Sequence, residues 1–157
     1  MEVHVRCVGM ARLIEKLRDK EEDIADMRNF WRSVGLYLQK RSTKDCFEKE
    51  QSPDGTKWAP WSEKYRKRME RLGKRGRHKI LSDIGELRRS VKYVAFKARV
   101  IVGSNLRYAR RHQMGDKNGA VAGGASGIPS RPFLGIVDRD RLEILRMMRD
   151  YFRRHRR

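Results

Sequence analysis

The chain has 157 residues, and its 39 Lys and Arg against 20 Asp and Glu give a formal net charge of +19. This length suits one domain with a modest core. The surplus charge favours contact with a polyanion or an acidic protein, although a solvated basic surface explains it equally well. Cys7 and Cys46 form no CxxC pair, and no apolar run approaches the ~20 residues of a membrane span. These features argue against a disulfide scaffold, a zinc site and membrane association, and they suit a reducing cytoplasm.

The N-terminal part predicts a short strand followed by one long helix. Apolar and polar residues alternate from 2 to 8, which is the period of a half-buried strand. Between Glu21 and Glu50, apolar residues recur at steps of three and four, as in a helix with one buried stripe. The stripe consists of Ile24, Met27, Trp31, Val34 and Leu38. We expect this helix to be the centre of the core.

A turn and a basic helix are predicted next. Pro-Asp-Gly at 53–55 favours a turn, and Trp58 and Trp61 look exposed, at a packing corner or at a contact with a partner. Ser62 can cap a helix that reaches Leu72. The apolar face of that helix carries Tyr65, Met69 and Leu72, and the other positions are mostly basic: Lys64, Arg66, Lys67, Arg68 and Arg71.

A short helix and a hairpin follow. Asp83, with Glu three residues later, resembles a capping box, so we expect a helix from Asp83 to about Ser90. The runs 91–96 and 98–104 are rich in β-branched and aromatic residues. They predict two antiparallel strands that form a hairpin.

A further helix is expected to end at Gly115, where glycine allows a left-handed stop. Ser104 or Asn105 can cap its N-terminus, and within it Tyr108 and His112 share one face.

Two unusual segments follow that helix. Residues 115–127 are rich in Gly and Ala without periodicity, so we expect a mobile insertion. In residues 128–135, two prolines stiffen an extended strip. Phe133 and Leu134 either anchor this strip in a groove or sheet edge of a neighbouring subunit, or pack inside their own subunit with Arg131 held by a carboxylate.

The last helix is expected to begin near Asp138. Its apolar residues form two stripes, Leu142, Leu145, Met148 and Phe152 on one side and Ile144, Met147 and Tyr151 on the other. A face this wide can meet two neighbours, and a second subunit is a candidate for one of them.

We expect no catalytic, metal or cofactor site. His4, His78, His112 and His155 share no metal-ligand spacing. His112 has no base or carboxylate beside it, which favours a hydrogen-bonded structural role. The Gly-rich segment lacks the Gly-Lys-Ser/Thr ending of a P-loop. Candidate nonspecific DNA contacts, with a solvated surface as the equal alternative, are Lys64, Arg66, Lys67, Arg68, Arg153, Arg154, Arg156 and Arg157.

Four motifs occur in a recognisable order. They are PDGTKWAPWS at 53–62, ILSDIGELRRS at 80–90, VGSNLRYARRHQMG at 102–115 and IPSRPFLG at 128–135. Together they resemble the phage virion morphogenesis family, the tail-completion proteins of Mu-like and related contractile-tailed phages. The resemblance implies a non-enzymatic α+β or α/β subunit that forms a ring at the head-proximal end of the tail or at the neck of the virion, after assembly in the host cytoplasm.

The sequence therefore predicts one small α+β (or α/β) domain over residues 1–157, with a long N-terminal core helix, a small antiparallel sheet including the hairpin near 91–104, and a C-terminal helix. The expected function is tail completion or head–tail joining through a homo-oligomeric ring, a hexamer if it follows the six-fold tails of the family. The expected partners are other copies of the chain, tail tube or tail terminator proteins, head connector proteins, and genome DNA passing through the ring. The alternative is a stand-alone basic nucleic-acid-binding protein. The predicted interface residues are Trp58, Trp61, Tyr108, His112, Gln113, Pro129, Arg131, Pro132, Phe133 and Leu134.

Overall fold

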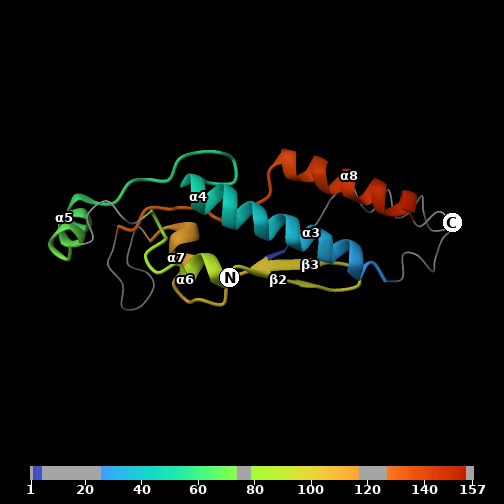
Figure 1. The fold of residues 1–157 in the computed structure, drawn as a ribbon, viewed down its shortest axis with the longest axis horizontal. Coiled ribbons are helices and arrows are strands. Elements are labelled where there is room, and N and C mark those ends of the chain that lie inside the picture. The colour runs from blue at the N-terminus through green and yellow to red at the C-terminus, as the bar shows by residue number, and fades with distance from the viewer. Residues whose placement is uncertain (1, 5–25, 74–78, 117–126, 155–157) are drawn as a thin grey trace.

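The structure, a computed structural model, describes residues 2–4, 26–73, 79–116 and 127–154. In these residues a central helix, α3 (Arg28–Lys40), lies between a small sheet and the C-terminal helix α8 (Asp138–Arg154), as Figure 1 shows. The antiparallel sheet has the strand order β1-β3-β2. Its strands are β1 (Glu2–His4), β2 (Lys92–Ala95) and β3 (Val100–Gly103). The predicted α+β fold is confirmed.

The predicted long helix is present. α3 continues through a π-helical segment, η1 (Arg41–Cys46), into α4 (Phe47–Lys49), and the chain then turns at Glu50, whose φ is 52°. Four residues of the predicted stripe are buried, namely Met27, Trp31, Val34 and Leu38, while Ile24 lies outside the described residues. The helix contacts the sheet on one side and α8 on the other, which explains why so much of its surface is apolar.

Gly35 allows α3 to approach the sheet closely. A Cβ atom at this position would lie 2.4 Å from Cδ2 of Tyr93 and 3.0 Å from Cγ2 of Val100. Glycine therefore makes room for the Tyr93 ring between the helix and the sheet.

The predicted hairpin is confirmed. Val94 of β2 lies opposite Ile101 of β3, and the turn closes where the Phe96 N–H donates to the Arg99 carbonyl at 2.8 Å. β1 pairs with the other edge of β3. The strand predicted for residues 2–8 is thus confirmed for its first part, and residues 5–8 lie outside the described residues.

The predicted start of the helix after Asp83 is wrong. α6 (Glu86–Ser90) begins after Gly85, and no side chain caps it. Gly85 has a φ of 74°, in the left-handed region. Residues before it therefore cannot continue the helix.

The predicted cap at Ser104 or Asn105 is also wrong. α7 (Ala109–Met114) begins later, without a side-chain cap. The Ser104 hydroxyl instead accepts from the Leu106 N–H at 3.2 Å and shares a 2.7 Å hydrogen bond with the Ser90 hydroxyl. It joins the end of β3 to α6 and is not available to a helix.

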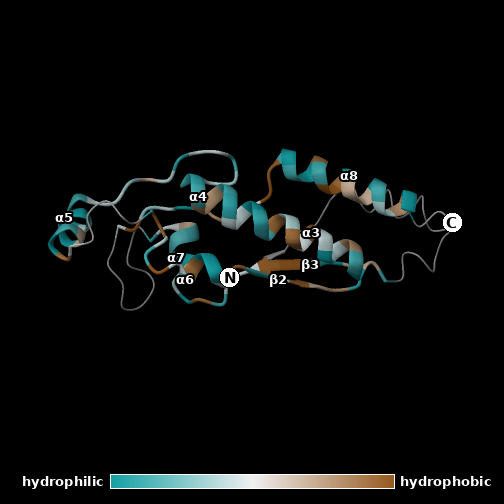
Figure 2. Ribbon diagram, in the orientation of Figure 1, coloured by the Kyte–Doolittle hydropathy of each residue, from teal (hydrophilic) through white to brown (hydrophobic). Residues whose placement is uncertain are grey.

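A turn and a projecting helix follow α4. A bridge between Gln51 and Lys57 encloses the predicted turn, where Gly55 has a φ of 95°. α5 (Glu63–Arg71) starts after Ser62, whose Oγ accepts from the Tyr65 N–H at 3.3 Å, as predicted. None of its residues is buried. It lies at one end of the molecule, beyond the other elements (Figure 1), and is mostly hydrophilic (Figure 2). We call residues 62–72 the arm.

α8 begins at Asp138, as predicted. Its buried residues are Asp140, Ile144 and Met148, whereas Leu142 of the first predicted stripe is 68% exposed. One side of the wide apolar face therefore packs against α3, and the other side remains accessible.

Candidate functional site

Most residues predicted to contact a partner meet where three distant segments are joined. The segments are 58–61, 108–116 and 128–135, and we call this place the junction. The Arg131 N–H donates to the His112 carbonyl at 2.6 Å, and the Trp58 indole N–H donates to the Pro132 carbonyl at 2.8 Å. The proline-rich strip is therefore hydrogen-bonded on both of its sides.

Gln113 makes three hydrogen bonds to the strip. Its Nε2 donates to the Leu134 carbonyl at 2.6 Å, while its Oε1 accepts from the N–H groups of Phe133 and Leu134, each at 3.1 Å. These backbone groups belong to buried residues outside any helix or strand. A buried backbone polar group without a partner is costly. Gln113 thus replaces the partners that a strand would have supplied.

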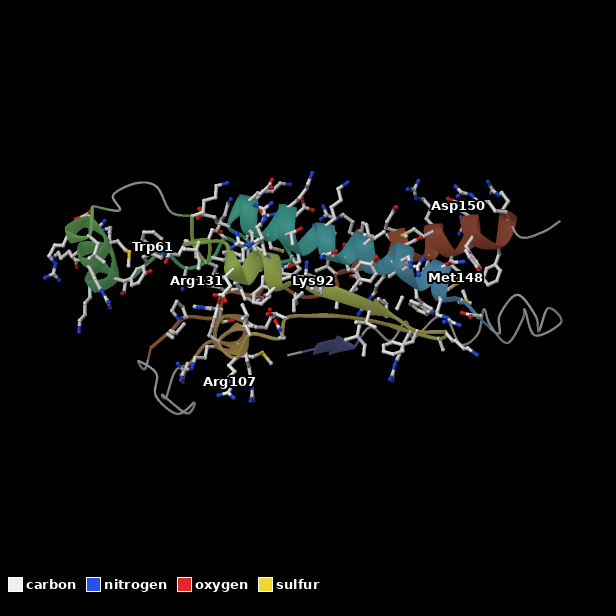
Figure 3. All side chains as sticks on the ribbon, turned by 60° about the horizontal axis from the view of Figure 1, so that its bottom comes forward. Trp61, Lys92, Arg107, Arg131, Met148 and Asp150 are labelled. Atoms are coloured by element: carbon white, nitrogen blue, oxygen red, sulfur yellow. The ribbon has the colours of Figure 1, made fainter. Side chains whose placement is uncertain are left out.

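Arg131 links the strip to the root of the arm. It is 7% exposed, and its guanidinium donates to the carbonyls of Ala59 at 2.8 Å and Pro60 at 2.9 Å. Backbone carbonyls therefore hold it, and the predicted carboxylate partner is wrong. Burial lowers its pKa. Figure 3 shows Arg131 at the end of the body that faces α5, with Trp61 close by.

The two tryptophans differ in environment. Trp58, which looked exposed from the sequence, is 5% exposed, and its ring packs edge-on against Phe47 with centroids 5.6 Å apart. Trp61 is half-buried, and its ring lies edge-on against the Tyr65 ring of the arm, with ring centroids 5.3 Å apart. Trp58 therefore belongs to the core, and Trp61 to the connection with the arm.

Phe133 and Leu134 lie in the core of their own subunit. Phe133 is 0% exposed and its ring lies 5.4 Å from that of Phe47, and Leu134 is 5% exposed. Of the two alternatives from the sequence, packing within the subunit is the one observed. The exposed residues of the strip are Pro129, Ser130 and Gly135.

Tyr108 and His112 share a face, as predicted, with ring centroids 6.0 Å apart. The Tyr108 hydroxyl donates to Glu86 at 2.9 Å, and burial together with this bond raises its pKa to about 12. The Nδ1 atom of His112 is buried without a hydrogen-bond partner in the described residues. Burial first, and then the charges of Arg131 and Arg111, lower the pKa of His112.

The Gly-rich segment starts and ends at the junction. The Asp116 N–H donates to the Ile128 carbonyl at 2.8 Å. Gly115 has a φ of 77°, and a Cβ atom there would lie 2.8 Å from the Ser130 nitrogen. Only glycine allows this close approach. The mobile insertion was predicted for residues 115–127. Its ends at Asp116 and Gly127 are joined by a 2.8 Å hydrogen bond from the Gly127 N–H to the Asp116 carbonyl, and residues 117–126 lie outside the described residues.

The candidate DNA contacts fall into two separate groups. Lys64, Arg66, Lys67 and Arg68 are exposed on α5, where Lys67 pairs with Glu63 at 3.2 Å. Arg153 and Arg154 are exposed at the end of α8, and Arg156 and Arg157 lie outside the described residues. Because α5 and the end of α8 are at opposite ends of the molecule (Figure 1), they do not form one binding site within a subunit.

Sequence reasoning missed a buried polar cluster beside the junction. Asp140 is 0% exposed and accepts from the Tyr37 hydroxyl and the Arg41 guanidinium, both at 2.7 Å, and from the Val137 N–H at 3.1 Å. Arg41 also pairs with Asp45 at 2.6 Å. The cluster ties α8 to the central helix. No sequence signal links residues 99 positions apart.

The described residues contain no group of three or more His, Cys, Asp and Glu side chains suited to a metal ion. Among the helices described, none has the length and apolar character to cross a membrane.

Comparison with known proteins identifies the chain at the level of the family. Neither a curated protein nor a solved structure matches it. The model of the phage virion morphogenesis family matches residues 8–153, which include the arm, the junction and almost all of α8. The chain therefore belongs to the phage virion morphogenesis family.

Proposed function

We propose that this chain is a structural, non-enzymatic virion protein that completes the tail or joins it to the head, and that it acts as a homo-oligomeric ring. A role in phage virion morphogenesis follows from the family. The ring and its place at the neck are the proposal. A hexamer is the expected size, with a tail tube or tail terminator protein on one side and a head connector protein on the other.

The main support for the proposal is that the arm projects from the body without a buried residue. α5 has nine residues and none is buried, whereas isolated helices shorter than about 12 residues are marginal in water. Tyr65 is 39% exposed and Leu72 is 58% exposed on its apolar face. Such a helix gains stability when another surface covers that face, and assembly into a ring supplies one.

The charge of the chain fits the same setting. A ring of subunits that each carry +19 repels itself unless negative charge lies nearby. Genome DNA that passes through the opening would supply this charge, and the exposed basic residues of the arm are suited to nonspecific phosphate contacts.

Native mass spectrometry and negative-stain electron microscopy test the ring. We expect closed particles of one uniform stoichiometry, either from the purified chain or after a tail tube protein is added. A strict monomer at high concentration, with the tail proteins present, would refute the proposal.

The exposed basic face of α5 also supports the alternative, a stand-alone nucleic-acid-binding protein. Such a protein would bind duplex DNA as a monomer. With six or more phosphate contacts, its affinity would fall by about a thousandfold or more between 50 and 200 mM salt. Weak retention on DNA together with ring formation would instead favour the joining role.

A further inference from the structure

Described residues cover the apolar face of the arm only in part: the Trp61 ring lies edge-on against the Tyr65 ring, with centroids 5.3 Å apart, while Tyr65 and Leu72 are 39% and 58% exposed. Tyr65, Met69 and Leu72 follow at steps of four and three, so they lie on one side of the helix, and none of them is buried. Arg66 and Arg68 are the flanking positions of this face, and both are exposed. The arm therefore presents a narrow apolar surface with a basic rim.

The body carries an open groove of matching character. It has a volume of about 390 Å³, within the usual range for binding pockets, and lies between the turn after α4 and the proline-rich strip. Its apolar walls are formed by Pro53, Trp58, Pro132, Leu134, Ile136 and Val137. Four of these residues, Pro53, Trp58, Pro132 and Leu134, belong to the motifs at 53–62 and 128–135.

The groove offers one carboxylate to a basic partner. Asp54 lines the groove, whereas Asp138, directly after the lining residue Val137, has an 89% exposed side chain but already pairs with Arg141 at 2.9 Å. Lys57 also lines the groove, but its ammonium group donates to the Lys49 carbonyl at 2.7 Å. A helix whose apolar face is flanked by Arg66 and Arg68 therefore meets the Asp54 carboxylate at this groove.

The arm of the same subunit does not fill the groove. Arg131 holds the carbonyls of Ala59 and Pro60, directly before the arm. From there α5 extends beyond the body (Figure 1), away from the segments that form the groove. An arm that enters the groove must therefore come from another molecule.

We propose that the arm of one subunit docks its Tyr65, Met69 and Leu72 face into the groove of a second copy of this chain. The inference rests on the proposed ring and names its contact. Because arm and groove are different surfaces, the contact is heterologous, and a heterologous contact closes into a ring when the rotation between subunits permits.

Two variants test the contact. Leu72→Glu places a charge on the arm, and Thr56→Arg places bulk and positive charge at the groove, which Thr56 lines from an exposed position. Each should raise the dissociation constant for self-association at least about tenfold in sedimentation velocity. The control Leu36→Glu changes a 52% exposed leucine on α3 and should leave the ring intact. Neither test site is buried, so melting temperatures should match that of the wild type.

Mixing the two variants gives the decisive result. The Leu72→Glu subunit keeps its groove and the Thr56→Arg subunit keeps its arm, so an equimolar mixture should form a 1:1 dimer that cannot grow. A mixture that stays monomeric would overturn the docking proposal, as would rings that persist in either variant. If either result occurs while the wild-type chain still forms rings, only the docking proposal fails and the proposed function stands. A wild-type chain that is monomeric under all conditions would overturn the docking proposal and the proposed function together.

Discussion

Replacing Gln113 with leucine tests whether its amide holds the proline-rich strip in place. Leucine has a similar size, but it cannot form the three hydrogen bonds that Gln113 makes to Phe133 and Leu134. Because Phe133 and Leu134 are 0% and 5% exposed, water cannot easily replace the lost partners.

The expected cost follows from these groups. Each buried backbone group without a partner costs about 1–3 kcal/mol, and the buried methyl groups of leucine recover part of the loss. We expect the free energy of unfolding of Gln113→Leu to fall by about 3 kcal/mol. For a chain of this length, that corresponds to a decrease in Tm of roughly 6–12 °C.

Urea titration and differential scanning calorimetry measure the effect. The matched control is Ser130→Ala, which removes one hydrogen bond, at 2.9 Å, from an exposed hydroxyl to the Gln113 carbonyl. It should cost less than about 1 kcal/mol. If Gln113→Leu also costs less than about 1 kcal/mol, the burial of Phe133 and Leu134 alone holds the strip, and the reasoning is refuted.

Three further predictions concern the core. Asp140→Asn removes the buried charge that faces Arg41, and it should lower the free energy of unfolding by about 3 kcal/mol in urea titration. Gly35→Ala forces a Cβ atom against the Tyr93 ring, so calorimetry should show a loss of about 1–3 kcal/mol despite the better helix propensity of alanine. Burial and two neighbouring arginines lower the pKa of His112 from 6.5. As the pH falls, His112 therefore binds a proton in the unfolded chain at a higher pH than in the folded chain. The free energy of unfolding should be greatest above about pH 6.5 and should decrease as the pH falls below that value. Tm measured from pH 7.5 to 5 should show this decrease.

Each of these predictions has a comparison that can contradict it. Asp138→Asn, at a side chain that is 89% exposed, should change stability by less than about 0.5 kcal/mol; equal effects at Asp138 and Asp140 would mean that solvent screens both. An unchanged Tm in Gly35→Ala would show that the helix can move away from the sheet. Persistence of the full pH slope in His112→Gln would assign the titration to another group.

The elements of the fold could largely be predicted because their signals are local. The stripe of Met27, Trp31, Val34 and Leu38 predicts the central helix, and Ser62 marks the start of the arm. The starts of α6 and α7 could not be predicted in this way. A glycine at left-handed φ delays α6, and the Ser104 hydroxyl is bonded to Ser90 of another element.

The candidate site was predicted as a set of residues but not as a geometry. Sequence reasoning selected Trp58, Gln113 and Arg131, and the structure joins Trp58 and Gln113 to the strip that contains Arg131. The burial of Trp58 and the carbonyl partners of Arg131 depend on segments about 70 residues away. A local pattern holds no information about such partners.

The sequence by itself determined the period of each helix and strand, the charge of the chain and its family, because these depend on residue types and spacing alone. The tertiary structure decided which apolar faces are covered. Phe133 looked like an anchor for a neighbour but fills its own core, whereas Leu72 of the arm remains exposed. The physical reason is that periodicity identifies an apolar face, while its coverage depends on which distant segments pack against it.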